Sequence, residues 1–327
     1  MRIMLPRFWA WPSQLRKRGV LGINRRNLNY LFEANPRSVY RLADDKAVTK
    51  TICREHGIPV PETYAIIKRF GDLQQLSEII NGREEFVVKP AGGSGGRGVL
   101  VIIGRNNGLF EIANGQMISL SGLRYHISTT LSGLYSLAGQ PDRVILEQRI
   151  VPHPVFEKLA VRGTPDTRII MYRGSPIMAM LRLPTKASKG RANLHQGAVA
   201  VGIDLQTGQT FGGVYFDRVV TIHPDTGIDV GGVTIPCWDE VLRIAGNMSN
   251  IIKIGYIGID IMLDAQHGPL VLEVNARPGL SVQIANRCGL LPTLQQIDSK
   301  LSSSTPVDAP KQLVPDLAQA HLRQNLS

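Results

Sequence analysis

The chain has 327 residues and a formal net charge of +11, with 37 lysines and arginines against 26 aspartates and glutamates. Hydrophobic residues make up 43% and charged residues 19%, which supports a sizeable core and excludes a disordered polyelectrolyte. No apolar run approaches the ~20 residues of a membrane-spanning helix, because Lys253 and Asp260 interrupt the best candidate. Three widely spaced cysteines form neither a disulfide framework nor a zinc site, so we expect a cytoplasmic protein.

The first 42 residues are basic, and we expect them to be irregular. Phe8, Trp9 and Trp11 accompany the cations, a mixture that suits an anionic partner or a membrane surface, with a solvated arm as the alternative. The chain shows no zinc finger, RNA-binding aromatic signature or sustained basic helix, so no clear motif indicates nucleic acid. The early cations are Arg7, Arg16, Lys17, Arg18, Arg25 and Arg26.

Helices and strands are expected to alternate along the rest of the chain. A helix is predicted at about 44–56, ended by Gly57, and a second at about 72–80, ended by Gly82. The later predicted elements are strands at 86–89, 99–103, 144–148, 166–173, 176–183, 257–263 and 269–275, and a helix at about 238–252. From Ser302 the sequence becomes polar and rich in serine and proline, which predicts a loose tail. Such a mixture indicates an α/β or α+β architecture.

A glycine-rich loop lies between the predicted strands at 86–89 and 99–103. Because the loop is nearly free of side chains, its backbone N–H groups can approach phosphate oxygens closely, and Lys89 can add an ammonium group. A strand follows the loop, and no Gly-Lys-Ser/Thr is present, which excludes a Walker A motif and a dinucleotide fingerprint. The pattern predicts a phosphate site, with a flexible linker hairpin as the alternative.

A second pattern lies in residues 258–275. A four-residue turn at 265–268 would place Asp260 opposite Glu273, with Asn275 on the same face. Two neighbouring carboxylates repel each other unless a cation lies between them, and together with an amide oxygen they suit Mg²⁺. Solvent-facing polar residues of a half-exposed hairpin are the alternative. The core face of this hairpin would be formed by Ile259, Ile261, Leu272 and Val274.

A phosphate loop and a magnesium hairpin in one chain imply a nucleoside triphosphate site. With these motifs the chain resembles the ATP-grasp superfamily, most closely the ribosomal-S6-modifying type of glutamate ligase and its α-L-glutamate-ligase-like relatives. The resemblance covers about residues 44–295. The matching segments, in family order, are Asp45-Lys46 with Gly57-Ile58-Pro59-Val60-Pro61; Val87-Val88-Lys89 with its loop; Glu147-Gln148-Arg149-Ile150; Asp166-Thr167-Arg168; Ala192-Asn193-Leu194-His195-Gln196-Gly197; and Gly258-Ile259-Asp260 with Glu273-Val274-Asn275-Ala276-Arg277-Pro278-Gly279.

The resemblance implies an α+β fold, in which two lobes with antiparallel sheets clasp the nucleotide. The lobes would span 44–150 and 151–300, with a flexible tail at 301–327. A short basic segment at 1–43 would stand in place of the larger domain that usually precedes the first lobe. The implied ligands are ATP and Mg²⁺, for which Mn²⁺ can substitute.

The resemblance also implies a role for each matching residue. ATP would be bound by Lys46, Lys89, Gly93, Ser94, Gly95, Gly96, Glu147, Gln148 and Ile150, the last three residues contributing to the adenine-holding segment between the lobes. Asp260, Glu273 and Asn275 would bind the metal. Arg168, Asn193 and Arg277 would act on the phosphate and acyl groups. Simpler interpretations exist: Lys46 as a solvated helix charge, Glu147 on a polar strand face, and Arg168 and Arg182 in surface ion pairs.

The implied activity is that of an ATP-dependent carboxylate–amine ligase, which forms an amide through an acyl phosphate. Such an enzyme would add glutamate or another amino acid to a peptide or small amine, and we expect a homo-oligomer. The alternatives are a non-catalytic nucleotide-binding regulator and a protein that binds membranes or nucleic acid.

Overall fold

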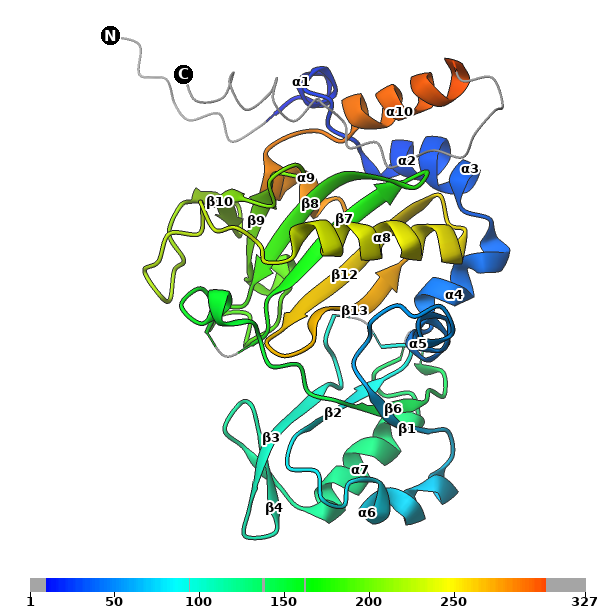
Figure 1. Ribbon diagram of the computed structural model, residues 1–327, viewed down its shortest axis with the longest axis vertical. Coiled ribbons are helices and arrows are strands. Elements are labelled where there is room, and N and C mark those ends of the chain that lie inside the picture. The colour runs from blue at the N-terminus through cyan, green and yellow to red at the C-terminus, as the bar shows by residue number, and fades with distance from the viewer. Residues whose placement is uncertain (1–9, 94, 137–138, 162, 304–327) are drawn as a thin grey trace.

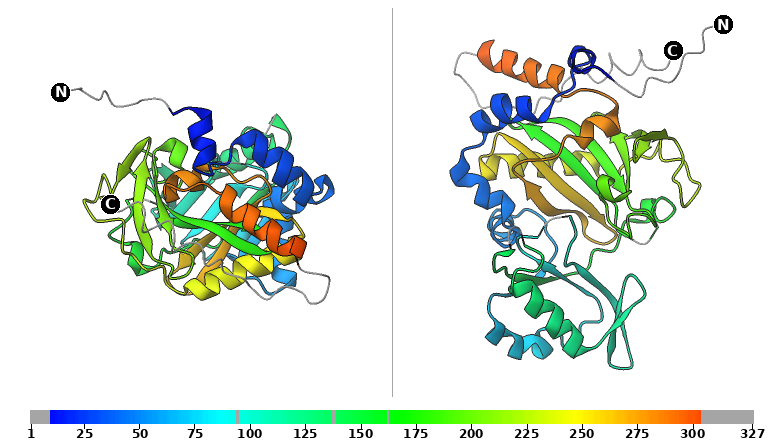
Figure 2. Two further views of the ribbon diagram at one scale, coloured as in Figure 1. Left: turned by 90° about the horizontal axis from the view of Figure 1, so that it is seen from above. Right: turned by 180° about the vertical axis from the view of Figure 1, so that it is seen from behind.

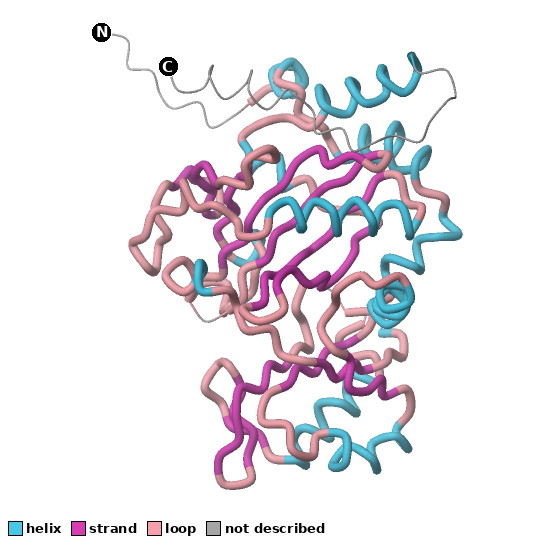
Figure 3. The backbone as a smooth tube through the Cα atoms, in the orientation of Figure 1, coloured by secondary structure: helices cyan, strands magenta, loops and turns pink. Residues whose placement is uncertain are grey.

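The computed structural model describes residues 10–93, 95–136, 139–161 and 163–303. Two antiparallel sheets lie one beyond the other along the long axis of the molecule, each with its own helices (Figures 1 and 3). This α+β arrangement is the fold that the sequence predicts. Within the described residues, no helix has the length and apolar character needed to cross a lipid bilayer.

The first sheet has six strands in the order β1-β6-β2-β3-β4-β5. Its strands are β1 (Thr63–Ile67), β2 (Phe86–Pro90), β3 (Leu100–Asn106), β4 (Leu109–Ile112), β5 (Met117–Ile118) and β6 (Val144–Glu147). Helices α6 (Leu76–Ile79) and α7 (Leu120–Leu131) bury one face through side chains such as Phe86, Leu123 and Leu146. The other face carries Ala91 and Ile145, which pack on Ala47 of helix α5 (Lys46–Glu55).

The second sheet has seven strands in the order β11-β10-β9-β8-β7-β12-β13. Its strands are β7 (Asp166–Tyr172), β8 (Ser175–Leu183), β9 (Val199–Ile203), β10 (Thr210–Tyr215), β11 (Arg218–Val220), β12 (Tyr256–Asp264) and β13 (Gly268–Asn275). Alternate side chains enter opposite cores, as a strand period of two requires. One core lies under α8 (Trp238–Ile252), and the other lies under α9 (Ser281–Asn286) and α10 (Leu291–Ser303).

Short helices run through the N-terminal residues, so the expectation that residues 1–42 are irregular is wrong for the described part from Pro12 onward. The elements are α1 (Pro12–Lys17), α2 (Ile23–Arg26), a π-helix (Asn27–Leu31), α3 (Phe32–Ala34), a 3-10 helix (Arg37–Val39) and α4 (Tyr40–Asp44). Leu21, Tyr30 and Leu31 are buried in the same core as α9 and α10. These helices are so short that no single apolar period runs through them, which hides them from a pattern search. Arg7, Phe8 and Trp9 lie outside the described residues.

The other predicted elements are present, with some changed bounds. The helix expected at 44–56 is divided at Asp45, whose side chain accepts hydrogen bonds from the N–H groups of Ala47 and Val48 and so caps α5. The helix expected at 72–80 begins as a 3-10 turn (Phe70–Gln75) before α6. Helix α10 runs through Ser302, so no loose tail begins there, and residues 304–327 lie outside the described residues. The expected division into lobes at 150 stays a prediction.

Candidate active site

The glycine-rich loop spans residues 91–99 between β2 and β3, as predicted. Gly95 and Gly96 have backbone φ angles of 64° and 71°, which residues other than glycine rarely adopt. The base of the loop is fixed at Gly92, whose N–H lies 3.0 Å from both carboxylate oxygens of Asp142. The loop is therefore a shaped backbone segment, and the flexible-linker alternative does not account for its contacts.

The tip of this loop meets a segment of the second sheet's half of the molecule. The side-chain amide of Gln196 donates to the carbonyl oxygen of Gly95 at 3.3 Å. A Cβ atom added to Gly95 would lie 3.7 Å from Nδ2 of Asn193. Asn193 thus lies beside the glycine loop, as its predicted role on the phosphate side requires. Ser94, another predicted ATP contact, lies outside the described residues.

Lys46 connects the glycine loop to the predicted metal hairpin. It is the first residue of α5, and its Nζ donates to the carbonyl oxygen of Gly93 at 2.6 Å. The same Nζ lies 3.4 Å from Oε2 of Glu273, and its side chain is only 16% exposed. Lys46 is therefore not a solvated helix charge. Its ammonium group stands where the loop of the first sheet and the hairpin of the second come together.

Lys89 lies in a buried ion triad on the first sheet. Its Nζ is 2.5 Å from Oε1 of Glu147, and the Nζ of Lys50 is 2.8 Å from Oε2 of the same carboxylate. Lys50 also donates to the carbonyl oxygen of Pro61 at 2.6 Å. Glu147 is fully buried, so it does not lie on a polar strand face. The triad carries one net positive charge, and the Lys89 ammonium is buried against Glu147 without an aligned hydrogen bond among the described residues.

The hairpin β12–β13 places Asp260 opposite Glu273, as predicted. The predicted four-residue turn is wrong, however: Asp264 pairs with Gly268, which leaves a three-residue loop. A β-bulge between Asp260 and Ile261 adds one residue on the partner strand and restores the predicted register at the site. Because of this bulge Leu272 is only half-buried and is not part of the core, contrary to expectation.

Glu273 and Asn275 lie side by side at the end of β13. Nδ2 of Asn275 donates to Oε1 of Glu273 at 3.3 Å, so the two side chains share one face. Ile259, Ile261 and Val274 form the core face of the hairpin, as predicted. The oxygen atoms of the hairpin therefore collect on the side away from that core.

Two arginines hold Asp260. Arg168 donates through Nε and Nη2 to the two oxygens of Asp260, both at 2.6 Å, and Arg182 adds a bond from Nη2 at 2.8 Å. Arg182 also binds both oxygens of Asp166, and Nη2 of Arg168 lies 3.9 Å from Glu273. Both arginines thus pair with buried carboxylates, not with surface ones.

This network forms because one face of the second sheet carries apolar side chains along one half of its length and charged side chains along the other. On β7, Arg168 is followed two residues later by Ile170, and on β8, Arg182 is preceded by Met180. Ile170 and Met180 belong to the core under α9 and α10, whereas both arginines lie beyond it. Charged and apolar halves of one face therefore meet in mid-sheet, and the charged half lies toward the first sheet.

The two aspartates of the network differ in their pKa. Burial alone would raise the pKa of Asp260, but the charges and hydrogen bonds of Arg168 and Arg182 outweigh it and hold this pKa well below its usual range. Burial raises the pKa of Asp166 to about 6, because the charge and hydrogen bonds of Arg182 offset burial only in part and the nearby Asp260 charge raises this pKa further. Asp260 is thus a permanent anion, while Asp166 titrates close to neutral pH.

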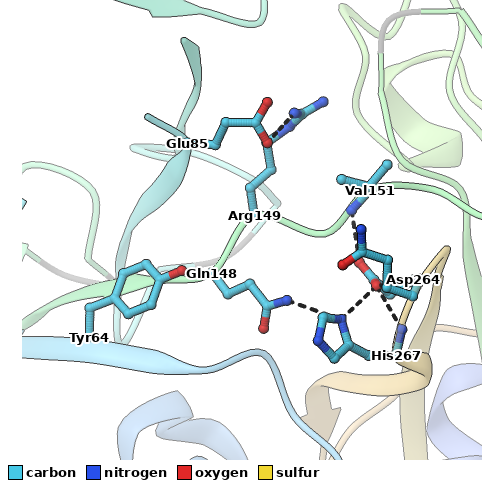
Figure 4. A pocket seen from close by; sticks show the side chains of 8 residues that line it. Tyr64, Glu85, Gln148, Arg149, Val151, Asp264 and His267 are labelled. Atoms are coloured by element: carbon cyan, nitrogen blue, oxygen red, sulfur yellow. Dashed lines mark hydrogen bonds and ion pairs between the residues drawn. The ribbon is translucent and has the colours of Figure 1, made fainter. Parts of the chain in front are cut away.

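The segment after β6 connects the two sheets and borders a small pocket of about 220 Å³ (Figure 4). The Gln148 side chain approaches the ring of His267 at 3.2 Å, and this ring also contacts Asp264 at 2.8 Å. Asp264 in turn accepts a hydrogen bond from the N–H of Val151. Ile150 is buried at this connection. The predicted role of this segment in holding adenine stays a prediction.

Arg277, another predicted catalytic residue, makes no contact with the hairpin carboxylates in the described part of the chain. Its guanidinium lies 3.3 Å from Asp44 and 5.4 Å from the centre of the Tyr40 ring, both on α4. The side chain is 58% exposed. It is therefore free to reorient toward an incoming anion.

The donor set suits a magnesium ion that is shared with phosphates. Within the described residues, no cluster of three or more histidine, cysteine, aspartate or glutamate side chains could hold a metal alone. Glu273 and Asn275 offer accessible oxygens, and three bonds to Asp260 leave one of its roughly four acceptor positions unused. All of these donors are hard oxygen ligands of the kind that Mg²⁺ prefers.

Some residues of the site escaped the sequence-based predictions. Lys50, Asp166 and Gln196 were assigned no role, although each contacts a predicted site residue or its partner. Lys50 lies one helical turn after Lys46, and this spacing was the available signal for a second cation on the same face. The burial of Asp166 and the contact of Gln196 depend on distant segments, so no local pattern reveals them.

The curated relatives of this chain match it over only part of their own length. Cyanophycin synthetase of Synechocystis sp. is 25% identical, with 76% of this chain and 29% of that protein covered. Cyanophycin synthetase of Trichormus variabilis is 24% identical, with 76% and 28% covered. The chain thus spans less than a third of the length of these relatives.

Solved structures with a similar arrangement include D-cycloserine synthetase DcsG, with a TM-score of 0.46, 16% identity, and 82% of this chain and 73% of that one covered. D-alanine–D-alanine ligase from Bacillus anthracis has a TM-score of 0.45 and 16% identity, with 80% and 68% covered.

The assignment rests on the family model, which confirms the superfamily but not the ribosomal-S6-modifying type. That model, described as sugar-transfer associated ATP-grasp, matches residues 25–299, and the chain belongs to this family.

Proposed function

We propose that this protein is an ATP-dependent carboxylate–amine ligase that forms an amide through an acyl phosphate. The observation that carries the proposal is the position of Lys46, which bonds to the Gly93 carbonyl and pairs with Glu273. The glycine-rich loop and the β12–β13 hairpin with its oxygen ligands thereby contact the same ammonium group. The family membership and the similarity to cyanophycin synthetases support the same assignment.

The reaction joins two anions, so charge neutralisation and alignment are the main tasks of the protein. Lys46, Lys89 and the N–H groups of the glycine loop would bind the phosphates of ATP. Arg168 and Asn193 would face the transferred phosphate and the substrate carboxylate. Attack of the carboxylate on the γ-phosphate forms the acyl phosphate and releases ADP. An amine then displaces inorganic phosphate, so the mechanism needs no side-chain nucleophile.

Asp260, Glu273 and Asn275 would hold Mg²⁺, with Mn²⁺ as a substitute. A bound divalent ion supplies positive charge to the phosphate oxygens during transfer. The paired arginines keep Asp260 ionised, and Lys46 and Arg168 keep Glu273 in place until the nucleotide enters. The chain's own contribution is thus an ionised, oriented set of oxygen atoms.

The substrates belong to classes that the site chemistry indicates. An amino acid, with glutamate as one candidate, would be joined to a peptide or small amine. Arg277, which is exposed and lies 3.3 Å from Asp44, is suited to hold a substrate carboxylate or the acyl phosphate. A cytoplasmic location and a homo-oligomer remain part of this proposal.

The test is ADP release measured across amino acids and short peptides, with mass spectrometry of the products. Glu273→Gln should lower turnover at least about 100-fold, because it removes charge from a group that would hold the metal. Its melting temperature should stay close to that of the wild type, since Glu273 is partly exposed. Glu240→Gln, which removes a surface partner of Arg243, is the matched control and should keep full activity.

Full ligase activity in Glu273→Gln would contradict the assignment of the hairpin. ATP binding without any acid-dependent and amine-dependent ADP release would favour a nucleotide-binding regulator instead.

A further inference from the structure

The run from α2 to α3 has two different faces. Arg26, Tyr30 and Leu31 point inward, and Nη1 of Arg26 donates to the carbonyl oxygen of Pro278 at 2.6 Å. The outward face carries Leu28 and Phe32, four residues apart, which are 66% and 56% exposed. The inner face fixes the run on the protein, so its apolar outer side chains remain in water.

Helix α1 repeats this arrangement on a smaller scale. Trp11 and Leu15 lie four residues apart and are both exposed, and no residue of α1 is buried. Arg16, Lys17 and Arg18 follow directly, and all three are exposed. Large apolar side chains in water next to several cations are typical of a helix that rests on a membrane interface.

All charged side chains at the start of the chain are positive. Residues 1–32 contain seven lysines and arginines and no aspartate or glutamate. The first acidic residue, Glu33, is already paired with Arg173 at 2.6 Å. An unbroken positive stretch of this kind favours an anionic partner, and its exposed aliphatic and aromatic groups favour one with an apolar interior.

The location separates this surface from the nucleotide site. Helices α1, α2 and α3 lie at the end of the molecule that is farthest from the first sheet (Figures 1 and 2). The active-site residues lie where the two sheets approach each other, at the opposite end of the second sheet. A partner at the N-terminal end would therefore leave the nucleotide site open.

We propose that this N-terminal surface docks the protein on an anionic lipid bilayer. The surface is defined by Trp11, Leu15, Arg16, Lys17, Arg18, Arg25, Leu28 and Phe32. Its cations bind the lipid headgroups, and its apolar side chains enter the boundary between headgroups and acyl chains. The docking is independent of the ligase reaction, and it would place that reaction next to a membrane.

The experiment is co-sedimentation of the full chain with vesicles of phosphatidylcholine alone or mixed with phosphatidylglycerol, at 0.1 and 0.5 M NaCl. We expect binding to the anionic vesicles at low salt, at least about tenfold weaker binding at high salt, and little binding to neutral vesicles. A triple substitution of Arg16, Lys17 and Arg18 by glutamine should weaken binding roughly 100-fold, since each cation near such a surface contributes on the order of a factor of five.

The apolar contribution is tested separately with Leu28→Ser combined with Phe32→Ser, which should weaken binding at least about tenfold. Val219→Ser with Ile222→Ser removes similarly exposed apolar groups from β11 and the segment after it and is the matched control. Lys68→Gln, Arg69→Gln and Arg124→Gln together remove three exposed cations near the first sheet and control for net charge. Both controls should bind within about twofold of the wild type.

Several results would overturn the proposal. The wild type failing to bind anionic vesicles would do so, as would control variants that weaken binding as much as the N-terminal ones. Salt-sensitive binding to RNA that Leu28→Ser with Phe32→Ser leaves unchanged, without vesicle binding, would assign the surface to nucleic acid instead.

Discussion

Replacement of Glu147 by glutamine tests the buried ion triad most directly. The wild-type triad has two ammonium groups within 2.8 Å of one carboxylate, and all three side chains are at most 5% exposed. Glutamine keeps the shape but raises the local charge from +1 to +2. Removing one partner of a buried ion pair costs about 3–5 kcal/mol, since a charge is left without compensation. Such a loss corresponds to a melting temperature lowered by about 6–15 °C.

The melting temperature of Glu147→Gln should be measured by calorimetry or circular dichroism between pH 7 and 9.5. Burial already lowers the pKa of Lys50, and loss of the carboxylate lowers it further. A lysine with a lowered pKa in the folded state opposes folding less as the pH rises, because it folds more readily in its neutral form. The deficit should therefore shrink toward pH 9.5.

Two variants sharpen this test. Glu147→Gln combined with Lys50→Met leaves only Lys89 charged and should recover most of the lost stability. Glu85→Gln removes the partner of Arg149 in a more exposed ion pair and should lower stability by no more than about 1 kcal/mol. The reasoning is refuted if Glu147→Gln melts as close to the wild type as Glu85→Gln does, or if its deficit does not depend on pH.

Lys46→Ala should raise the KM for ATP at least about tenfold in the ADP-release assay, because the glycine loop and the hairpin lose the ammonium group that both contact. The control Lys68→Ala should leave this KM unchanged. Equal KM values in the two variants would argue against phosphate binding by Lys46. The Asp166 carboxyl, with a pKa of about 6, should give turnover an acidic limb near pH 6, because protonation removes a partner of Arg182; in Asp166→Asn turnover should be low at all pH values and the limb absent. The raised pKa also means that Asp166 stabilises the fold below about pH 4 and that this contribution is lost as the pH rises through 6. If the acidic limb of turnover survives in Asp166→Asn, that limb belongs to another group.

The sequence predicted the parts of the site that depend on local patterns. The alternation in residues 269–275 was enough to place Glu273 and Asn275 on one face, because a strand shows every second side chain on one face, whereas the pairing of Asp260 with Glu273 followed from an assumed four-residue turn and holds only because the bulge offsets the shorter one. The glycine loop was equally visible, since few other residues adopt its backbone angles. Both features are properties of short segments.

The parts that could not be predicted depend on segments far apart in the chain. The burial of Lys50 against Glu147 joins residues almost a hundred positions apart, and an isolated lysine on a helix reads as solvated. The arginine pairs of Asp260 likewise come from two other strands. At the N-terminus, a π-helix between two short α-helices removes the regular spacing by which helices are recognised.

The β-bulge opposite Asp260 has a consequence for how this hairpin can change during evolution. Pairing near the turn is displaced by one residue relative to pairing near Glu273, and the bulge absorbs that difference. A turn longer by one residue, together with loss of the bulge, would again place Asp260 opposite Glu273. The tip and the base of the hairpin can therefore diverge separately, and turn length in homologous chains should vary together with the presence of the bulge while the acidic pair stays aligned.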